Sequence, residues 1–172
     1  MNRNVEIKAR VVGLDVVRKR VAALADDGPV VLDQEDTFFV CAAGRLKLRK
    51  INGKAGELIY YVRPDSAGPK TSQYVITEVS DAGGLEAVLA RAYGVRGVVR
   101  KRRTLYKVGR TRVHLDEVDD LGDFVELEVV LGPGEAISEG VAVADDLMDK
   151  LGLSRAQLLD GAYIDLMDEP RR

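Results

Sequence analysis

The chain has 172 residues, and its content of 46% hydrophobic and 31% charged residues is typical of a globular domain with a buried core. Its formal net charge of -2 provides no global attraction to nucleic acid or to an acidic membrane, and its single cysteine, Cys41, excludes an internal disulfide and a cysteine-cluster metal site. The start of the sequence has no apolar signal region, and no apolar run is long enough to span a membrane. We therefore expect one domain over residues 1–172, acting in the cytoplasm.

In chain order, the alternation of charged and apolar residues predicts a first strand at 4–12, because successive side chains of a strand point to opposite faces. Apolar residues at helical spacing then predict an amphipathic helix at 14–25. The stretch 30–40 contains β-formers interrupted by the polar run D-Q-E-D, which indicates two short strands or a strand and a loop. Further strands are expected at 44–50, 57–63 and 71–79.

Capping signals mark a second helix at 82–93, with Asp81 placed to cap its start and Gly94 to stop its end. The pattern then predicts strands at 98–108, 111–118 and 124–131, followed by a helix at 136–151. Ser154 is placed to cap a last short helix, and 162–167 is interpreted as a return to the sheet.

One feature repeats from strand to strand: one face is charged and the other is aliphatic. If the helices cover the aliphatic faces from outside, the sheet closes into an eight-stranded antiparallel barrel with a charged lumen, an α+β fold. The side chains expected in this lumen are Glu6, Lys8, Arg45, Lys47, Arg49, Arg63, Lys101, Arg103, Arg112, Asp116, Glu126 and Glu128. Crowded cations are unfavourable in a poorly solvated space, so this pattern indicates a triphosphate or polyphosphate site, with a plain solvated sheet as the alternative.

Two of these acids, Glu126 and Glu128, point to the same face of the strand F-V-E-L-E-V-V-L. They repel each other unless a divalent cation lies between them, and Mg²⁺ and Mn²⁺ prefer oxygen ligands. Paired acids on an exposed strand face are the ordinary alternative.

Several motifs, in this order and spacing, resemble the CYTH family, which groups class IV adenylate cyclases with thiamine triphosphatases among the triphosphate tunnel metalloenzymes. The family's E-x-E-x-K strand is similar to N-V-E-I-K at 4–8, and its basic strand to R-L-K-L-R at 45–49. Its K-x-R strand is similar to K-R-R at 101–103, its late acidic residue to Asp116, and its closing E-x-E to E-L-E at 126–128. The resemblance implies an eight-stranded tunnel that binds a triphosphate with Mg²⁺ or Mn²⁺.

The resemblance also assigns roles to single residues. Glu6, Glu126 and Glu128 would be metal ligands, and Asp116 would sit near the metal or orient a basic neighbour. Lys8 and Asp116 would serve catalysis. The triphosphate would be held by Lys8, Arg45, Lys47, Lys101 and Arg103, to which strand parity adds Arg49, Arg63 and Arg112. The sequence departs from the family at Asn4, where a glutamate is usual, and this weakens any second metal position.

The motifs leave the reaction open, because the shared residues bind the shared triphosphate. A cyclase would convert ATP to cyclic AMP and pyrophosphate, and the stretch G-A-Y-I-D-L at 161–166 looks closer to that branch. A triphosphatase would hydrolyse thiamine triphosphate, inorganic triphosphate or a nucleoside triphosphate. A third reading is a binder that has lost its chemistry at Asn4.

Expected partners are limited to a small-molecule triphosphate and, by resemblance, a second copy of the chain. Nucleic-acid binding through R-K-R-R at 100–103 is disfavoured, because half of this run is expected to face the lumen. No membrane partner is expected. His114, the one histidine of the sequence, is interpreted as packed and hydrogen-bonded rather than as a catalytic base.

Overall fold

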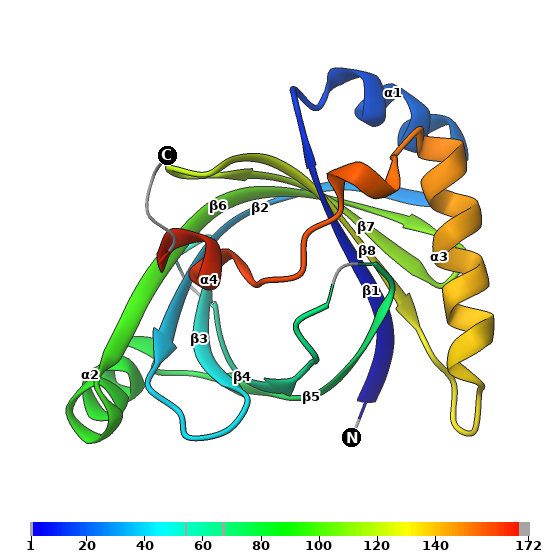
Figure 1. Cartoon of the computed structure of the whole chain (residues 1–172). Coiled ribbons are helices and arrows are strands. Elements are labelled where there is room, and N and C mark those ends of the chain that lie inside the picture. The colour runs from blue at the N-terminus through cyan, green and yellow to red at the C-terminus, as the bar shows by residue number, and fades with distance from the viewer. Residues whose placement is uncertain (1, 54, 67, 169–172) are drawn as a thin grey trace.

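The computed structural model describes residues 2–53, 55–66 and 68–168, and its centre is a closed barrel of antiparallel strands (Figure 1). Around the barrel the strands follow the order β1-β5-β4-β3-β2-β6-β7-β8, and β8 pairs with β1 to close it. The expected eight-stranded α+β barrel is therefore confirmed. The strands are β1 (Asn2–Val11), β2 (Asp27–Phe39), β3 (Arg45–Ile51), β4 (Ala55–Val62), β5 (Lys70–Val79), β6 (Val95–Val108), β7 (Thr111–Val118) and β8 (Gly122–Val130).

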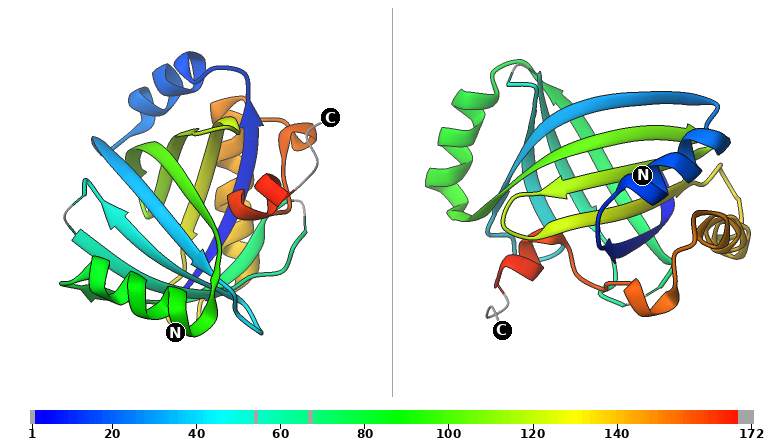
Figure 2. Two further views of the ribbon diagram at one scale, coloured as in Figure 1. Left: turned by 90° about the vertical axis from the view of Figure 1, so that its left-hand side faces the viewer. Right: turned by 90° about the horizontal axis from the view of Figure 1, so that it is seen from above.

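The hydrophobic core lies between the barrel wall and the helices rather than inside the barrel. Helices α1 (Asp15–Leu24) and α3 (Ile137–Leu151) pack on the outer, aliphatic faces of β1, β7 and β8 (Figures 1 and 2). Val125, Leu127 and Val129 on that face have no exposed surface, and full burial of each such side chain contributes about 1.5–3 kcal/mol. The opposite face of these strands is thus left to polar side chains.

Helix α2 (Ala82–Tyr93) covers β2, β3 and β4 on another side of the barrel (Figure 2). The Asp81 side chain accepts a hydrogen bond from the Gly84 backbone N–H, as expected for its N-cap. In the part of the chain that the structure describes, no helix is both long and apolar enough to cross a membrane.

Strand β2 is one continuous strand, so the prediction of two short strands or a strand and a loop was wrong. Its polar run remains in the sheet because cations across the strand pair neutralise it. On the outer face Asp33 pairs with Arg102 at 3.0 Å and Glu35 with Arg100 at 2.8 Å, while the next acid along the strand, Asp36, turns inward.

The chain end does not return to the sheet as predicted at 162–167. It forms a 3₁₀ turn, η1 (Arg155–Gln157), capped by Ser154 as expected, and then the short helix α4 (Tyr163–Asp168). A closed barrel offers no free strand edge for this segment to pair with.

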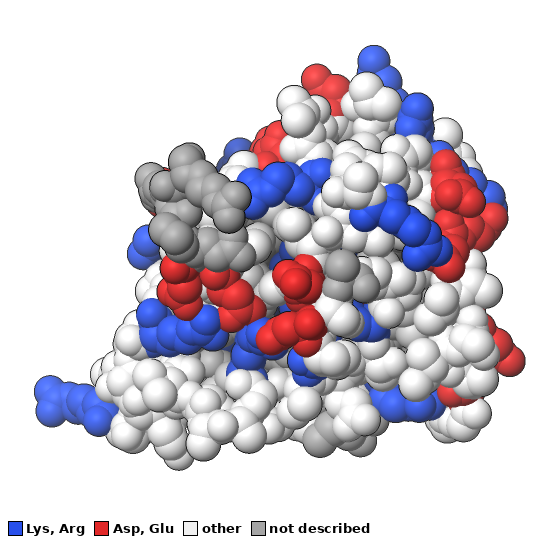
Figure 3. Space-filling model, viewed as in Figure 1, with Lys and Arg blue, Asp and Glu red and all other residues white. Residues whose placement is uncertain are grey.

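The segment 152–168 instead crosses one end of the barrel (Figure 1). The ammonium of Lys70 ties it down by donating to the carbonyl oxygens of Leu159 and Asp160 at 3.0 and 2.8 Å. Viewed from this end, the surface mixes acidic and basic side chains and shows no broad area of one charge (Figure 3).

Candidate functional site: a charged cavity inside the barrel

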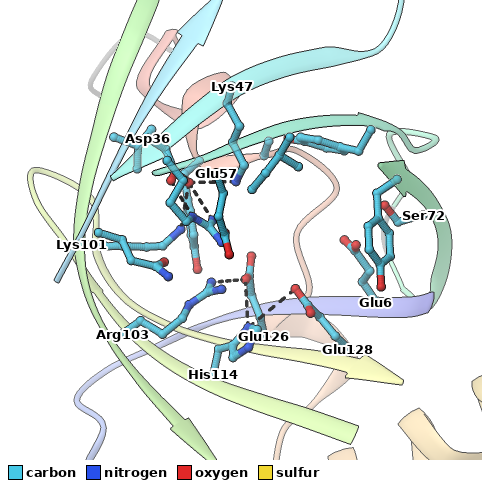
Figure 4. A pocket seen from close by; sticks show the side chains of 18 of the residues that line it. Glu6, Asp36, Lys47, Glu57, Ser72, Lys101, Arg103, His114, Glu126 and Glu128 are labelled. Atoms are coloured by element: carbon cyan, nitrogen blue, oxygen red, sulfur yellow. Dashed lines mark hydrogen bonds and ion pairs between the residues drawn. The ribbon is translucent and has the colours of Figure 1, made fainter. Parts of the chain in front are cut away.

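The barrel encloses a cavity of ≈ 300 Å³ to which all eight strands contribute side chains. Among the described residues, seven lysines and arginines and five acids line it. The cations are Lys8, Lys47, Arg49, Arg63, Lys101, Arg103 and Arg112. The acids are Glu6, Asp36, Glu57, Glu126 and Glu128 (Figure 4). Positive charge therefore exceeds negative charge in a space with little solvent, which favours an anionic ligand.

One acid, Asp36, holds three of these cations. Its carboxylate accepts hydrogen bonds from Nε and Nη2 of Arg49, at 2.7 and 2.9 Å, and from the ammonium of Lys47 at 2.8 Å. It also lies 3.4 Å from the ammonium of Lys101. Although burial alone would raise the pKa of Asp36, Arg49, Lys101 and Lys47 hold that pKa well below its usual value. The carboxylate is thus ionised and acts as a shared counter-ion.

A second ion-pair network joins the barrel wall to the C-terminal segment. Arg103 donates to both oxygens of Asp116, at 2.7 and 2.6 Å, and to Glu126 at 2.5 Å. Tyr163 also donates to Asp116, at 2.8 Å. Asp116 has no exposed surface and does not line the cavity. Its oxygens are occupied by Arg103 and Tyr163, so its position suits the orientation of Arg103 better than contact with a ligand.

Glu126 and Glu128 point into the cavity side by side with His114, as Figure 4 shows. The Nδ1 atom of His114 lies 3.7 Å from Glu126 Oε2 and 3.7 Å from Glu128 Oε1. Lys8 pairs with Glu126 at 2.9 Å, and Arg112 pairs with Glu128 at 2.8 Å. Although burial alone would raise the pKa of Glu126, Lys8 and Arg103 hold that pKa well below its usual value.

Two other side chains of the cavity have unused hydrogen-bonding atoms. Arg63 pairs with Glu6 through Nη1 at 2.7 Å, but its buried Nε and Nη2 atoms have no partner among the described residues. The buried Oδ1 of Asn4 likewise has no partner there. Buried donors without a partner are rare, and Nε with Nη2 forms the fork that binds two oxygens of a phosphate.

Comparison with known proteins assigns the family. A model of the CYTH domain matches residues 2–163, nearly the whole chain. The chain belongs to the CYTH family. An adenylate cyclase CyaB from Aeromonas hydrophila is 28% identical over 174 residues, which cover 96% of this chain and 88% of that protein.

Solved structures agree with this CYTH assignment. The PH1012 protein from Pyrococcus horikoshii OT3 is 28% identical and superposes with a TM-score of 0.85 over 95% of this chain and 98% of that one. A putative adenylyl cyclase from Hippeastrum, HpAC1, shares the fold at 15% identity, with a TM-score of 0.67 over 95% and 92% of the two chains.

The donor atoms of the CYTH cavity suit a divalent cation. Among the described residues, one group of potential metal ligands has its ligand atoms within 4.8 Å of one another. It consists of His114, Glu126 and Glu128. Carboxylate and imidazole are both common ligands of divalent metals. Glu6, a predicted ligand, instead faces Arg63, and the predicted ligand Asp116 lies behind Arg103.

The structure brings ten of the twelve side chains expected in the lumen to the cavity. Asp116 is one exception, and Arg45 is the other, because it pairs with Asp65 and Asp165, each at 2.7 Å, near the chain end. Arg45 therefore already has acidic partners outside the cavity lining.

Sequence reasoning missed two contributors to the site. Asp36 was interpreted as part of a break in the strand, although it alternates with Gln34 and Phe38, which also line the cavity. His114 was interpreted as a hydrogen-bonded packing residue, yet its Nδ1 has no hydrogen-bond partner among the described residues. Its shared parity with Arg112 is the signal that could have placed it in the lumen.

Proposed function

We propose that this protein is a divalent-metal-dependent enzyme that acts on a triphosphate, and that its reaction is the class IV adenylate cyclase type, from ATP to cyclic AMP and pyrophosphate. The observation that carries the proposal is the cavity inside the barrel with an excess of lysine and arginine, in which Arg63 retains donors without a partner among the described residues. The 28% identical adenylate cyclase CyaB supports the cyclase over other triphosphate reactions.

The cations of the cavity would bind the triphosphate by exchanging partners. In the structure Lys8, Arg103 and Arg112 pair with Glu126 and Glu128. A metal on these two glutamates would lower the charge on the phosphates and stabilise the attacking oxygen. The lysines and arginines would then turn from the glutamates to phosphate oxygens, which accept the same charge-assisted hydrogen bonds.

In the cyclase reaction the ribose 3′-oxygen forms a bond to the α-phosphorus while the bond from that phosphorus to the leaving pyrophosphate breaks, and the proton of the 3′-hydroxyl is released to solvent. The chain contributes mainly position and fixed positive charge, which stabilise the departing pyrophosphate. Lys8 is placed for this task, because its buried ammonium lies beside Glu126 and 3.4 Å over the centre of the Tyr163 ring. Asp116 would act as a positioning residue, because it holds the guanidinium of Arg103.

Hydrolysis of a triphosphate at the same site is the second candidate function. The putative adenylyl cyclase HpAC1, which shares this fold, has a dominant triphosphatase activity. Water would then attack the terminal phosphorus in place of the ribose oxygen, with the same cations on the same phosphates.

A phosphorus NMR time course with ATP and either Mg²⁺ or Mn²⁺ tests both reactions, with thiamine triphosphate and inorganic triphosphate in parallel. Cyclic AMP with equal pyrophosphate would support the cyclase, and orthophosphate with a diphosphate product would support the triphosphatase. Triphosphates that bind but remain unchanged would contradict both and leave a binder, for which Asn4→Glu is the variant to make.

A further inference from the structure

We propose that His114 is a nitrogen ligand of the metal site, and that the cluster of His114, Glu126 and Glu128 selects a first-row transition metal such as Mn²⁺, Co²⁺ or Zn²⁺ over Mg²⁺. This inference deepens the proposed function and rests on it for the two glutamates as metal ligands. It adds the histidine and the class of metal.

The state of the His114 side chain is the first support. The residue is 4% exposed, and its Nδ1 has no hydrogen-bond partner in the described part of the chain. Buried polar atoms nearly always have a partner, and a neutral imidazole nitrogen without a hydrogen is a metal ligand as well as an acceptor. The atoms facing it, Glu126 Oε2 and Glu128 Oε1, are acceptors when ionised and cannot donate to it.

The distances fit ligands of one ion. Nδ1 lies 3.7 Å from each of the two glutamate oxygens, and His114, Glu126 and Glu128 each offer a ligand atom within 4.8 Å of the other two. Two ligands about 2.1 Å from a common metal are about 3.4 Å apart in a tetrahedron and about 4.2 Å apart when opposite each other. The two 3.7 Å distances from Nδ1 to the glutamate oxygens fall between these limits without movement of the backbone.

The strands fix this arrangement. His114 on β7 is directly opposite Glu126 on β8, and Arg112 is opposite Glu128, so all four side chains lie on one face of an antiparallel pair. Figure 4 shows His114, Glu126 and Glu128 on this face. Side chains opposite each other on neighbouring strands are close enough to act on one ligand. The site is therefore built on rigid elements rather than on loops.

The chemical type of the ligand atoms determines which metal ion the site prefers. Mg²⁺ prefers oxygen ligands and retains water, whereas imidazole favours transition metals, whose affinities increase from Mn²⁺ to Co²⁺ and beyond. A site of two carboxylates and one imidazole therefore favours these ions. The rival arrangement is a protonated His114 that only neutralises the two glutamates, and it predicts no nitrogen bond to a metal.

The sequence makes the test direct, because it contains one histidine. Tag-free protein labelled with ¹⁵N-histidine is loaded with Mn²⁺ in the absence of triphosphate and measured by pulsed EPR beside unlabelled protein. We expect a nitrogen coupling that changes with the isotope, and any such coupling comes from His114. Bound Mn²⁺ without this coupling, or no bound Mn²⁺, overturns the proposal.

Titration calorimetry with Co²⁺ and Mg²⁺ tests the selectivity. We expect His114→Gln to weaken Co²⁺ binding by at least about tenfold and to change Mg²⁺ binding by less than about threefold. Glu117→Gln, on the exposed face of the same strand, is the matched control and should change neither. Equal losses for both metals in His114→Gln contradict the selectivity.

These measurements are independent of turnover. Nitrogen ligation in a protein that leaves every triphosphate intact would support the metal site and overturn the proposed reaction. Turnover of a triphosphate by a protein whose bound Mn²⁺ shows no histidine coupling would support the proposed reaction and overturn the assignment of His114 as a metal ligand. The two proposals can therefore fail separately.

Discussion

Tyr163 donates a hydrogen bond from its hydroxyl to Oδ2 of Asp116 over 2.8 Å, and this bond joins the segment that crosses the barrel end to the buried ion pair of Arg103. The ring of Tyr163 packs edge-on against Phe124, with ring centres 4.9 Å apart, and lies under the ammonium of Lys8. One side chain therefore connects the closure of the barrel end with the charges of the cavity.

We expect Tyr163→Phe to lower the free energy of unfolding by about 1–2 kcal/mol, because it removes a hydrogen bond to a buried charged group and keeps the ring contacts. Urea unfolding measures this change. Tyr93→Phe is the control, because Tyr93 is 57% exposed, and should change stability by less than about 0.5 kcal/mol. Equal values for the two variants would show that the bond to Asp116 contributes nothing.

Neighbouring arginines on β6 offer a matched comparison of a buried and an exposed ion pair. Arg103→Lys should lower the free energy of unfolding by about 2 kcal/mol or more, because one ammonium cannot replace the two hydrogen bonds to Asp116 and the one to Glu126. Arg102→Lys should cost less than about 0.5 kcal/mol, because the Arg102 side chain is 60% exposed and so is its partner Asp33. Thermal and urea unfolding should rank the variants in this order, and a reversed order would contradict the buried network.

Under the proposed function, Asp36 would compete with a bound triphosphate for the same cations. Asp36→Asn should destabilise the free protein by about 3 kcal/mol or more, because it leaves Lys47, Arg49 and Lys101 without their shared counter-ion. Inorganic triphosphate should also raise the melting temperature of Asp36→Asn more than that of the wild type. The reason is that the anion relieves a stronger repulsion among the three cations in the variant. Asp33→Asn, on the exposed face of the same strand, should do neither.

If Asp36→Asn and wild type gain the same thermal stabilisation from inorganic triphosphate, the ligand does not bind to these cations. That result would also argue against the cavity as the triphosphate site.

The barrel could be predicted because its strands alternate charged and aliphatic faces, and this alternation is regular over residues 4–11 of β1 and 125–129 of β8. Helix α2 was predicted with its observed ends because Asp81 and Gly94 are strong local caps. Alternation within a strand and capping of a helix both depend on residues that are close together in the sequence, so both can be recognised from a short segment.

The missed features depend on strand register and closure, which no short window contains. The polar run of β2 was interpreted as a break because its partners, Arg100 and Arg102, are 65 and 69 positions away along the chain. Parity put His114 on the same strand face as Arg112, but its distance from Glu126 and Glu128 is set by the pairing of β7 with β8. The residues at 162–167 form a helix because the closed sheet has no edge left for them.

Under the proposed function, Lys101 would make triphosphate binding depend on pH. Burial lowers its pKa to about 7, and Arg103 and Arg49 add to the decrease although Asp36 opposes it. The ammonium is therefore partly neutral near neutral pH in the free protein. A bound triphosphate favours the charged form, so the pKa of Lys101 rises on binding and the protein takes up a proton above about pH 7.

Calorimetry with inorganic triphosphate in two buffers of different ionisation enthalpy measures this proton uptake. At about pH 8 we expect uptake of most of one proton by the protein, and below about pH 6 almost none, because Lys101 is already charged there. Lys101→Met should remove most of the uptake at the higher pH. Uptake that is unchanged in Lys101→Met would assign the proton to another group and contradict the lowered pKa of Lys101.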